Sequence, residues 1–334
     1  MKPILSLCLI FLWCSCHQAS SGGEVPQIES DTSQRFPKPD SLSHFKETVF
    51  VPTLESRIPT GKTAIYTPTL LLSWDKLREA LPDGISLFPD APEELKLLNT
   101  TSSFKDALRK GEYEVTAGAE GGLLYAKSKF SKSLPYKIPF DSLVDFLQFN
   151  NTPVRAFGLL RYDYLIVDNF SINSYKDADH FVVTLQPADT TQEIIMAKGL
   201  SHFSNLSAGI KAVNAWLAAG KTEEHLYFDT RDELAIPVLR FNLATRYSSL
   251  EQQSILSKST SFLLAEVSQR IALVMDENGT EVESEAVAAA AVDSMPPAPK
   301  KLYFDKPYLV MMKRKTVKEP YFVMWVNNSE LMMK

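Results

Sequence analysis

The segment from Asp276 to Pro297, with the sequence DENGTEVESEAVAAAAVDSMPP, constrains the fold more than any other part of the chain. In its first half glutamates alternate with small residues, an alanine run follows, and a double proline closes it. The alternation suits a strand, alanine favours a helix, and proline interrupts both. Strand-like stretches precede and follow the segment. A fold for this chain therefore has to accommodate a long connection whose sequence favours neither a continuous helix nor a continuous strand.

Composition sets the broad class. The chain has 334 residues, of which 45% are hydrophobic and 22% charged, with a formal net charge of −5. Such a chain forms an ordinary globular core, in one large domain or two small ones, and the absence of a second linker favours one. The longest basic run, Lys313–Lys315, lies between two apolar strand-like stretches, so we expect it to decorate a hairpin. We predict no nucleic-acid partner and a monomeric protein.

The N-terminus carries a targeting signal. The apolar run from Ile4 to Trp13 is too short to span a bilayer as a helix, which predicts a secretion signal. All three cysteines lie in or at the end of this signal, at positions 8, 14 and 16. The rest of the chain therefore cannot form the disulfide framework of a small secreted domain.

Leu12–Cys16 resembles the lipobox of bacterial lipoproteins. The resemblance implies that Cys16 is lipidated and anchors the protein to a membrane of the bacterial cell envelope, either in the outer membrane or at the cell surface. An ordinary cleaved signal peptide is the alternative. Residues 17–41 are rich in Ser, Gly and Pro and predict a flexible tether, so the expected domain spans residues 42–334.

Periodicity predicts an α+β fold with mixed and antiparallel sheets. Helical spacing of apolar residues occurs within 63–82, after a short strand, in part of 91–109, and in 206–219. Strand patterns fill most of the remainder. The predicted strands lie at 120–130, 153–172, 179–187, 233–247, 267–277, 301–315 and 320–328. Helices are expected in the first two thirds and strands in the last, which argues against alternating βαβ units.

Motifs of catalysis are absent from the sequence. There is no G-x-S-x-G elbow, no glycine-rich phosphate loop, and no H-E-x-x-H or C-x-x-C motif outside the signal. The five histidines are scattered along the chain. We therefore expect a protein that is not an enzyme and that uses neither a metal nor another cofactor.

The region around the opening segment resembles the C-terminal third of serpins. In that family a strand ends in an acidic-Gly-Thr-Glu hinge, an exposed reactive-centre loop follows, and the chain returns with F-x-x-P-F before a closing strand. The matching residues are Glu277, Gly279, Thr280, Glu281, Phe304, Lys306, Pro307, Tyr308, Phe322, Met324 and Val326. Weaker similarity extends over residues 120–334, with Phe130 where the family has Trp. We therefore expect a serpin-like fold.

Two departures from the family pattern stand out. The stretch between residues 82 and 120 is too short for the several helices and the edge strand that serpins have there, which implies a reduced helical layer. Trp325 stands where the final strand of the family has a glycine, which implies different packing at that point.

The resemblance implies a function. Serpins inhibit proteases as suicide substrates, because the cleaved loop enters a sheet as a new strand and distorts the acyl-enzyme. Such a strand needs one uncharged face. The set of alternate positions that begins at Thr280 and contains Val282, Ser284 and Ala286 is uncharged and small up to Ala290, whereas the other set carries the glutamates. A surface helix is the alternative interpretation of the alanine run.

Hinge spacing in the family places the cleaved bond at Asp293-Ser294, with Ala291-Val292 and Val292-Asp293 as alternatives. The sequence thus predicts a serpin-like inhibitor whose partner is a serine, or alternatively a cysteine, endopeptidase. The second prediction is a non-inhibitory binding lipoprotein on the same fold.

Overall fold

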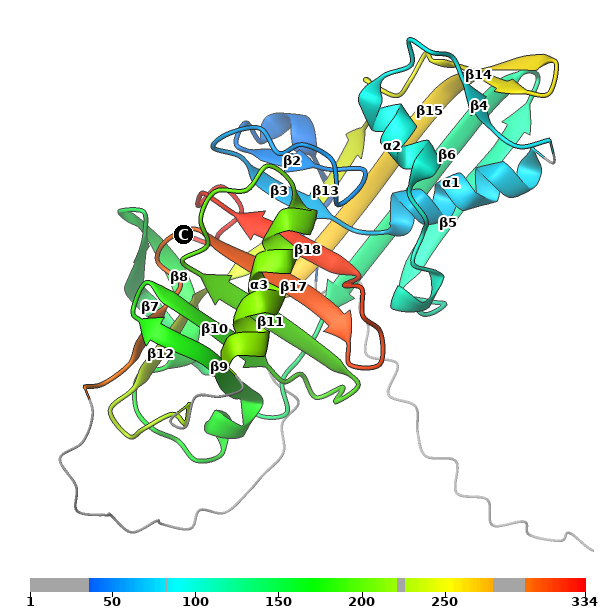
Figure 1. Cartoon of the computed structure of the whole chain (residues 1–334). Coiled ribbons are helices and arrows are strands. Elements are labelled where there is room, and N and C mark those ends of the chain that lie inside the picture. The colour runs from blue at the N-terminus through cyan, green and yellow to red at the C-terminus, as the bar shows by residue number, and fades with distance from the viewer. Residues whose placement is uncertain (1–35, 82, 221–225, 279–297) are drawn as a thin grey trace, which may run out of the picture.

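Three β-sheets and three α-helices make up the described part of the chain (Figure 1). The structure is a computed structural model and describes residues 36–81, 83–220, 226–278 and 298–334. The predicted signal and most of the predicted tether lie outside these residues, as does the greater part of the Asp276–Pro297 segment.

The first sheet is built around β15, the longest strand of the structure. Its seven strands are β1 (Asp40–Ser41), β13 (Leu239–Arg246), β15 (Thr260–Met275), β14 (Ser254–Ser257), β4 (Ser86–Leu87), β6 (Leu123–Ser133) and β5 (Tyr113–Glu120). On one side β15 pairs with β14 and then β13, both antiparallel, and on the other side it pairs in parallel with β6. Among the described strands, β5 pairs only with β6 and so forms an edge.

The second and third sheets complete the fold. In order across the second sheet the strands are β2 (Thr48–Phe50), β3 (Thr63–Tyr66), β18 (Phe322–Val326), β17 (Tyr308–Arg314), β11 (Gln192–Lys198), β10 (His180–Leu185) and β9 (Phe170–Asp177). The third sheet runs β16 (Lys301–Tyr303), β12 (Glu233–Pro237), β8 (Thr152–Leu159) and β7 (Asp141–Phe149).

Helices cover one face of each large sheet. They are α1 (Thr69–Ala80), α2 (Glu93–Thr100) and α3 (Leu206–Gly220), with 3₁₀ turns η2 (Leu42–His44), η3 (Lys105–Ala107) and η4 (Ile166–Asn169). The buried side of α1 carries Leu70, Trp74 and Leu77 at helical spacing, and the helix packs on β5 and β6. Figure 1 shows α3 lying across the second sheet.

Phe130 joins the two large sheets. Its side chain points inward from β6, is fully buried, and stacks on Phe322 of β18 with ring centroids 6.1 Å apart. The Tyr321 ring lies 6.2 Å away on the same side. One aromatic residue thus positions the end of β6 against the second sheet, at the position where the serpin resemblance predicted an aromatic side chain.

These elements confirm the α+β class with mixed sheets, since parallel pairs occur in all three sheets. The predicted helices at 63–82 and 206–219 correspond to α1 and α3. The prediction that strands concentrate in the last third was wrong, because β5 to β11 fill residues 113–198. Many of their outward positions are polar, and the edge strands β5 and β7 lack the apolar alternation that identifies strands.

Three predicted strands each contain two separate strands of the structure. Residues 153–172 hold β8, η4 and the start of β9. Residues 233–247 change from the third sheet to the first after Pro237, and residues 301–315 change from the third to the second between Tyr303 and Tyr308. Proline has no N–H for a sheet ladder, and a proline lies at each of these two changes, Pro237 and Pro307.

Folded structure begins before the predicted boundary at residue 42. Residues Asp40 and Ser41 form β1 along β13, and the Asn242 side chain donates a hydrogen bond to the Pro37 carbonyl at 2.7 Å. At the other end of the chain, Trp325 fills space against Phe203, with ring centroids 4.8 Å apart.

We predict that Phe130→Ala lowers the free energy of unfolding by about 3–5 kcal/mol, because it removes a fully buried aromatic ring and leaves a cavity between the sheets. Urea unfolding monitored by circular dichroism measures the change. Phe130→Trp keeps an aromatic ring and should cost much less. Equal destabilisation by both variants would contradict this role.

Candidate functional site

The candidate site is the seam between β6 and β15. The two strands run parallel in continuous register from the Leu123 and Leu263 pair to the Ser133 and Val274 pair, with one irregularity between Leu264 and Glu266. Figure 1 shows them side by side along their length. Parallel neighbours present their carbonyl and N–H groups in the same sense, so a third strand between them can run antiparallel to both.

The position of β15 in the chain makes this seam relevant to the opening segment. The described chain leaves β15 at Met275 and ends at Asn278 before it resumes at Ala298. The Phe140 N–H donates to the Glu277 carbonyl at 3.0 Å, and the Tyr136 N–H donates to the Asn278 carbonyl at 3.1 Å. The segment therefore starts from a fixed point, beside the end of the strand that it follows.

A polar network lies on the inner face of the first sheet, on the β15 side of the seam. Gln269 of β15 is buried, and its amide nitrogen donates to the hydroxyls of Thr67 and Thr69, both at 2.9 Å. The Tyr247 hydroxyl donates to the amide oxygen of Gln269 at 2.5 Å. Because burial would otherwise penalise these groups, the network ties β15 to the start of α1.

Ser128 faces Gln269 across the seam and contrasts with it. The two residues are register partners, and both side chains point inward. The buried Ser128 hydroxyl has no hydrogen-bond partner among the described residues. An unsatisfied hydroxyl in the interior raises the free energy of the paired sheet by about 1–3 kcal/mol. The β6 side of the seam is therefore less well satisfied than the β15 side.

Charged residues cluster beneath the end of β6 nearest to the opening segment. Lys132 points inward and is paired with Glu112 at 2.5 Å, and Glu112 also accepts from Arg314 of β17 at 2.6 Å. Burial lowers the pKa of Lys132. Burial also opposes ionisation of Glu112, but the hydrogen bonds from the Arg109 N–H, Arg314 and Lys132 outweigh it and lower the pKa of Glu112.

The outer face of the seam is charged. Lys127 pairs with Glu266 across the seam at 2.6 Å, and Lys129 pairs with Glu114 of β5 at 2.7 Å. Lys129 and Arg270 are register partners and point to the same face. Like charges in facing positions weaken strand pairing, so Lys129 and Arg270 oppose the pairing of β6 with β15, whereas the ion pair of Lys127 with Glu266 supports it.

The chain that follows the segment is fastened separately. The buried Asp232 carboxylate accepts from the Lys300 N–H at 2.6 Å and from its ammonium at 2.9 Å. From there β16 pairs in parallel with β12 in the third sheet. The segment thus connects a strand of the first sheet to an edge of the third.

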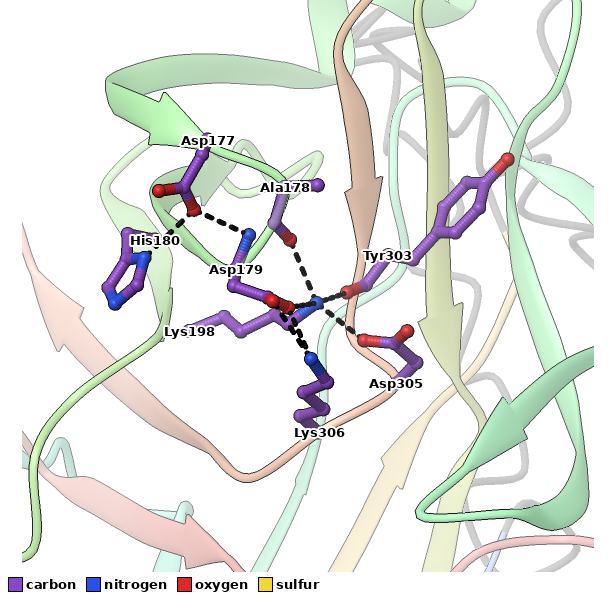
Figure 2. Close-up of polar contacts among 8 residues, drawn as sticks. All are labelled: Asp177, Ala178, Asp179, His180, Lys198, Tyr303, Asp305 and Lys306. Atoms are coloured by element: carbon purple, nitrogen blue, oxygen red, sulfur yellow. Dashed lines mark hydrogen bonds and ion pairs between the residues drawn. The ribbon is translucent and has the colours of Figure 1, made fainter.

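Figure 2 shows a second fastening, around Lys198. This side chain is 2% exposed, and its ammonium donates to the carbonyls of Ala178 and Tyr303, both at 2.8 Å, and to Asp305 at 2.5 Å. Asp179 lies 3.1 Å from the same nitrogen and also binds Lys306. The Lys306 ammonium lowers the pKa of Asp179.

These contacts attach the residues just before β17 to the turn between β9 and β10. Gly199 is required beside them, because its φ is +92° and a Cβ would come within 2.2 Å of the Asp179 carbonyl oxygen. Cutting the chain within the segment would leave the downstream part held by Lys198 and Asp232, while the upstream part stays attached to β15 and, through residues 277 and 278, to the backbone of Tyr136 and Phe140.

The structure places one predicted site residue. Glu277 lies two residues after the end of β15, and its carbonyl accepts a hydrogen bond from the Phe140 N–H. The other predicted residues lie outside the described part of the chain: Cys16, Gly279, Thr280, Glu281, Val282, Ser284, Ala286, Ala291, Val292, Asp293 and Ser294. Sequence reasoning did not identify the residues of the seam, although the strand predicted at 120–130 contains most of β6.

The residues that the structure describes contain no helix that is long and apolar enough to cross a membrane. They also contain no group of three or more His, Cys, Asp or Glu side chains arranged to hold a metal ion.

Comparison with protein families finds no match, and comparison with curated proteins finds none. Solved structures give similarities to serpins. Serine protease inhibitor (Serpin)-12 of Manduca sexta has a TM-score of 0.40 and 14% identity over 64% of this chain and 57% of that chain. Native protease nexin-1 with heparin has a TM-score of 0.38 and 14% identity over 62% and 56%. SRPN18 from Anopheles gambiae has a TM-score of 0.40 and 14% identity over 61% and 56%. The chain thus spans less than two thirds of the length of these structures.

We predict opposite effects for the two facing residues of the inner seam. Ser128→Ala removes an unsatisfied hydroxyl and should raise the free energy of unfolding by about 1 kcal/mol. Gln269→Leu leaves the Tyr247 hydroxyl and both threonines without their partner and should lower it by about 2 kcal/mol or more. Urea unfolding of both variants tests the pair, and destabilisation by Ser128→Ala would contradict the assignment.

Acid should weaken the structure through Asp189, near Lys132. Burial raises its pKa, but hydrogen bonds from Thr191 and Gln192 and the Lys132 charge dominate and lower it to about 2. The unfolded value is about 3.9, so this carboxylate stabilises the fold above about pH 4, and the contribution is lost as pH falls toward about 2. We expect the stability difference between the wild type and Asp189→Asn to shrink over this interval in urea unfolding. A difference that is independent of pH would contradict it.

Proposed function

We propose that the protein is a serpin-like inhibitor of serine, or alternatively cysteine, endopeptidases. The target protease cleaves a bond in the segment that follows Asn278. The part of the segment upstream of the cut then enters the first sheet between β6 and β15. One observation carries this proposal: the strand that leads into the segment lies parallel beside β6 through the whole length of β6. The inserted strand would reverse direction after β15 and run antiparallel to both neighbours.

Hydrogen bonding alone does not drive such an insertion. Each new ladder bond contributes about 1 kcal/mol net, whereas ordering each residue costs about 1–2 kcal/mol. Burial of the inward side chains has to supply the difference, at about 25 cal/mol per Å² of apolar surface. The uncharged set from Thr280 to Ala290 meets this requirement, and the glutamates of the other set would point toward the charged outer face.

The two faces of the seam suit a sheet that opens. Insertion would separate Lys129 from Arg270 and so relieve their repulsion, and it would break the exposed ion pair of Lys127 with Glu266, which contributes little because solvent screens it. It would also offer new neighbours to the unsatisfied Ser128 hydroxyl. The Gln269 network stays with β15 and α1, so opening does not require it to break.

The chain itself supplies no catalytic group in this proposal, because the target protease provides the nucleophile. Sequence spacing supports cleavage at Asp293-Ser294, with Ala291-Val292 and Val292-Asp293 as the alternatives. The N-terminal sequence supports a location in the bacterial cell envelope with an anchor through lipid on Cys16, and we propose that the anchored protein acts as a monomer.

A second function is a non-inhibitory, serpin-like binding lipoprotein of the envelope. The reduced helical layer favours it, because α1 and α2 are the only α-helices before β5 in the described chain and β5 forms a bare edge. The two functions differ in one measurement. Loop cleavage raises the melting temperature markedly if the strand inserts, and leaves it unchanged in a protein that only binds.

We predict that the protein forms a covalent, SDS-resistant complex with the protease that cleaves its segment, and that Ser284→Arg abolishes the complex while cleavage continues. An elastase-like protease is the one to use if the bond is Ala291-Val292 or Val292-Asp293, because its pocket accepts small apolar side chains. The arginine would have to be buried unpaired beneath the sheet, at a cost of several kcal/mol. Glu285→Arg is the matched control, because position 285 belongs to the outward set and the variant should still trap protease. Gel electrophoresis after incubation with protease distinguishes the outcomes, and a Ser284→Arg variant that still forms the complex would contradict the proposal.

A further inference from the structure

A cleft of about 540 Å³ lies on the outer face of the first sheet, over the seam. Its lining includes Lys129 and Ser131 of β6, Arg270 of β15 and residues Phe36 to Pro39. This volume falls within the range of small-molecule sites. None of the functions argued above uses the cleft.

The charges in the cleft are unbalanced. Its cations are Lys38, Lys129 and Arg270, which come from three separate segments of the chain. The Arg270 Nε donates to the Asn242 side chain at 2.8 Å, and neither Arg270 nor Lys38 has a carboxylate partner among the described residues. The Arg270 guanidinium therefore has donors left for a ligand, and it faces Lys129 in register.

The two carboxylates of the lining do not neutralise these cations fully. Glu112 is already bound by Lys132, Arg314 and the Arg109 N–H beneath the sheet. Glu114 pairs with Lys129 at 2.7 Å but lies on β5, on the far side of Lys129 from β15. An anion between Lys129 and Arg270 would relieve their repulsion and receive charge-assisted hydrogen bonds from both.

We propose that this cleft binds a small organic dianion with an apolar group, for which an aryl phosphate is the simplest chemical case. The dianion lies between Arg270 and Lys129, and Lys38 approaches it from the N-terminal segment. Phe36, Pro37 and Pro39 provide apolar surface for the organic group. Arginine suits the site because its planar fork binds phosphate oxygens in pairs.

Occupancy would also affect the seam, a consequence that rests on the proposed strand insertion. Lys129 belongs to β6 and Arg270 to β15, so one bound dianion bridges the two strands that insertion has to separate. The ligand should therefore slow insertion while leaving cleavage of the segment unchanged.

Isothermal titration calorimetry of the full chain with phenyl phosphate tests binding, with inorganic phosphate and benzyl alcohol as comparison probes. We expect one site per chain, weaker binding of inorganic phosphate, and no binding of benzyl alcohol. Arg270→Gln and Lys129→Gln should each weaken phenyl phosphate binding about tenfold or more. Glu114→Gln should strengthen it, because it removes the competing carboxylate.

Lys127→Gln is the matched control, because Lys127 lies one strand period away on the same face of β6 and is absent from the cleft lining. It should change affinity less than twofold. Absence of phenyl phosphate binding, unchanged affinity in Arg270→Gln, or an equal loss in Lys127→Gln would each overturn the proposal. Circular dichroism confirms that the variants are folded.

The effect of ligand binding on strand insertion is measured by the rate at which the melting temperature rises after protease cleavage, with and without saturating phenyl phosphate. A slower rise in the presence of phenyl phosphate supports the proposal that the bound dianion bridges β6 and β15, and an unchanged rate overturns it. If no rise occurs in either case, the proposed inhibitory function fails, whereas the calorimetric result for the cleft stands independently.

Discussion

The parallel ladder between β6 and β15 is the interaction on which the rest of the structure depends. Strands β6 and β15 are more than a hundred residues apart in the chain, and the ladder brings their C-terminal ends to the same end of the sheet. At that end of the sheet lie the Phe130 aromatic contact with the second sheet, the buried ion pairs of Glu112, and the start of the Asp276–Pro297 segment. An antiparallel arrangement of the same strands would place the segment at the opposite end from these contacts.

The two ends of the segment are held by different physical means. Upstream, residues 277 and 278 are fixed by backbone hydrogen bonds, which any sequence could make. Downstream, buried charges fix the chain: Lys198 within its ring of carbonyls and carboxylates, and Asp232 with Lys300. Breaking a buried ion pair leaves an uncompensated charge at a cost of several kcal/mol, so the downstream attachment is specific and costly to release. This asymmetry is what a chain requires if only its upstream part is to move.

Much of this architecture followed from the sequence, and the reasons for the remainder are physical. Helical spacing identified α1 and α3 because one face of each is apolar. The positions of β15, β17 and β18 around the segment followed from the motif series that ends at Val326. Strands β5 and β7 were missed because an edge strand with an exposed face carries no apolar alternation. The changes of sheet near Pro237 and Pro307 were missed because a continuous strand-like run does not reveal where its pairing partner changes.

The seam could not have been found by motif, because its residues come from segments that the sequence keeps apart. Gln269 becomes meaningful only when Thr67 and Thr69 lie beside it, and Lys129 only when Arg270 faces it. The inner and outer faces of the first sheet therefore contribute different interactions. Neutral hydrogen bonds on the inner face hold β15 to the helix without depending on salt. On the outer face Lys129 and Arg270 oppose the pairing of β6 with β15 and Lys127 with Glu266 favours it, and salt screens both interactions. The groups that weaken the ladder between β6 and β15 are the facing cations of the outer face and the unsatisfied Ser128 hydroxyl of the inner face, and the Gln269 network does not depend on that ladder.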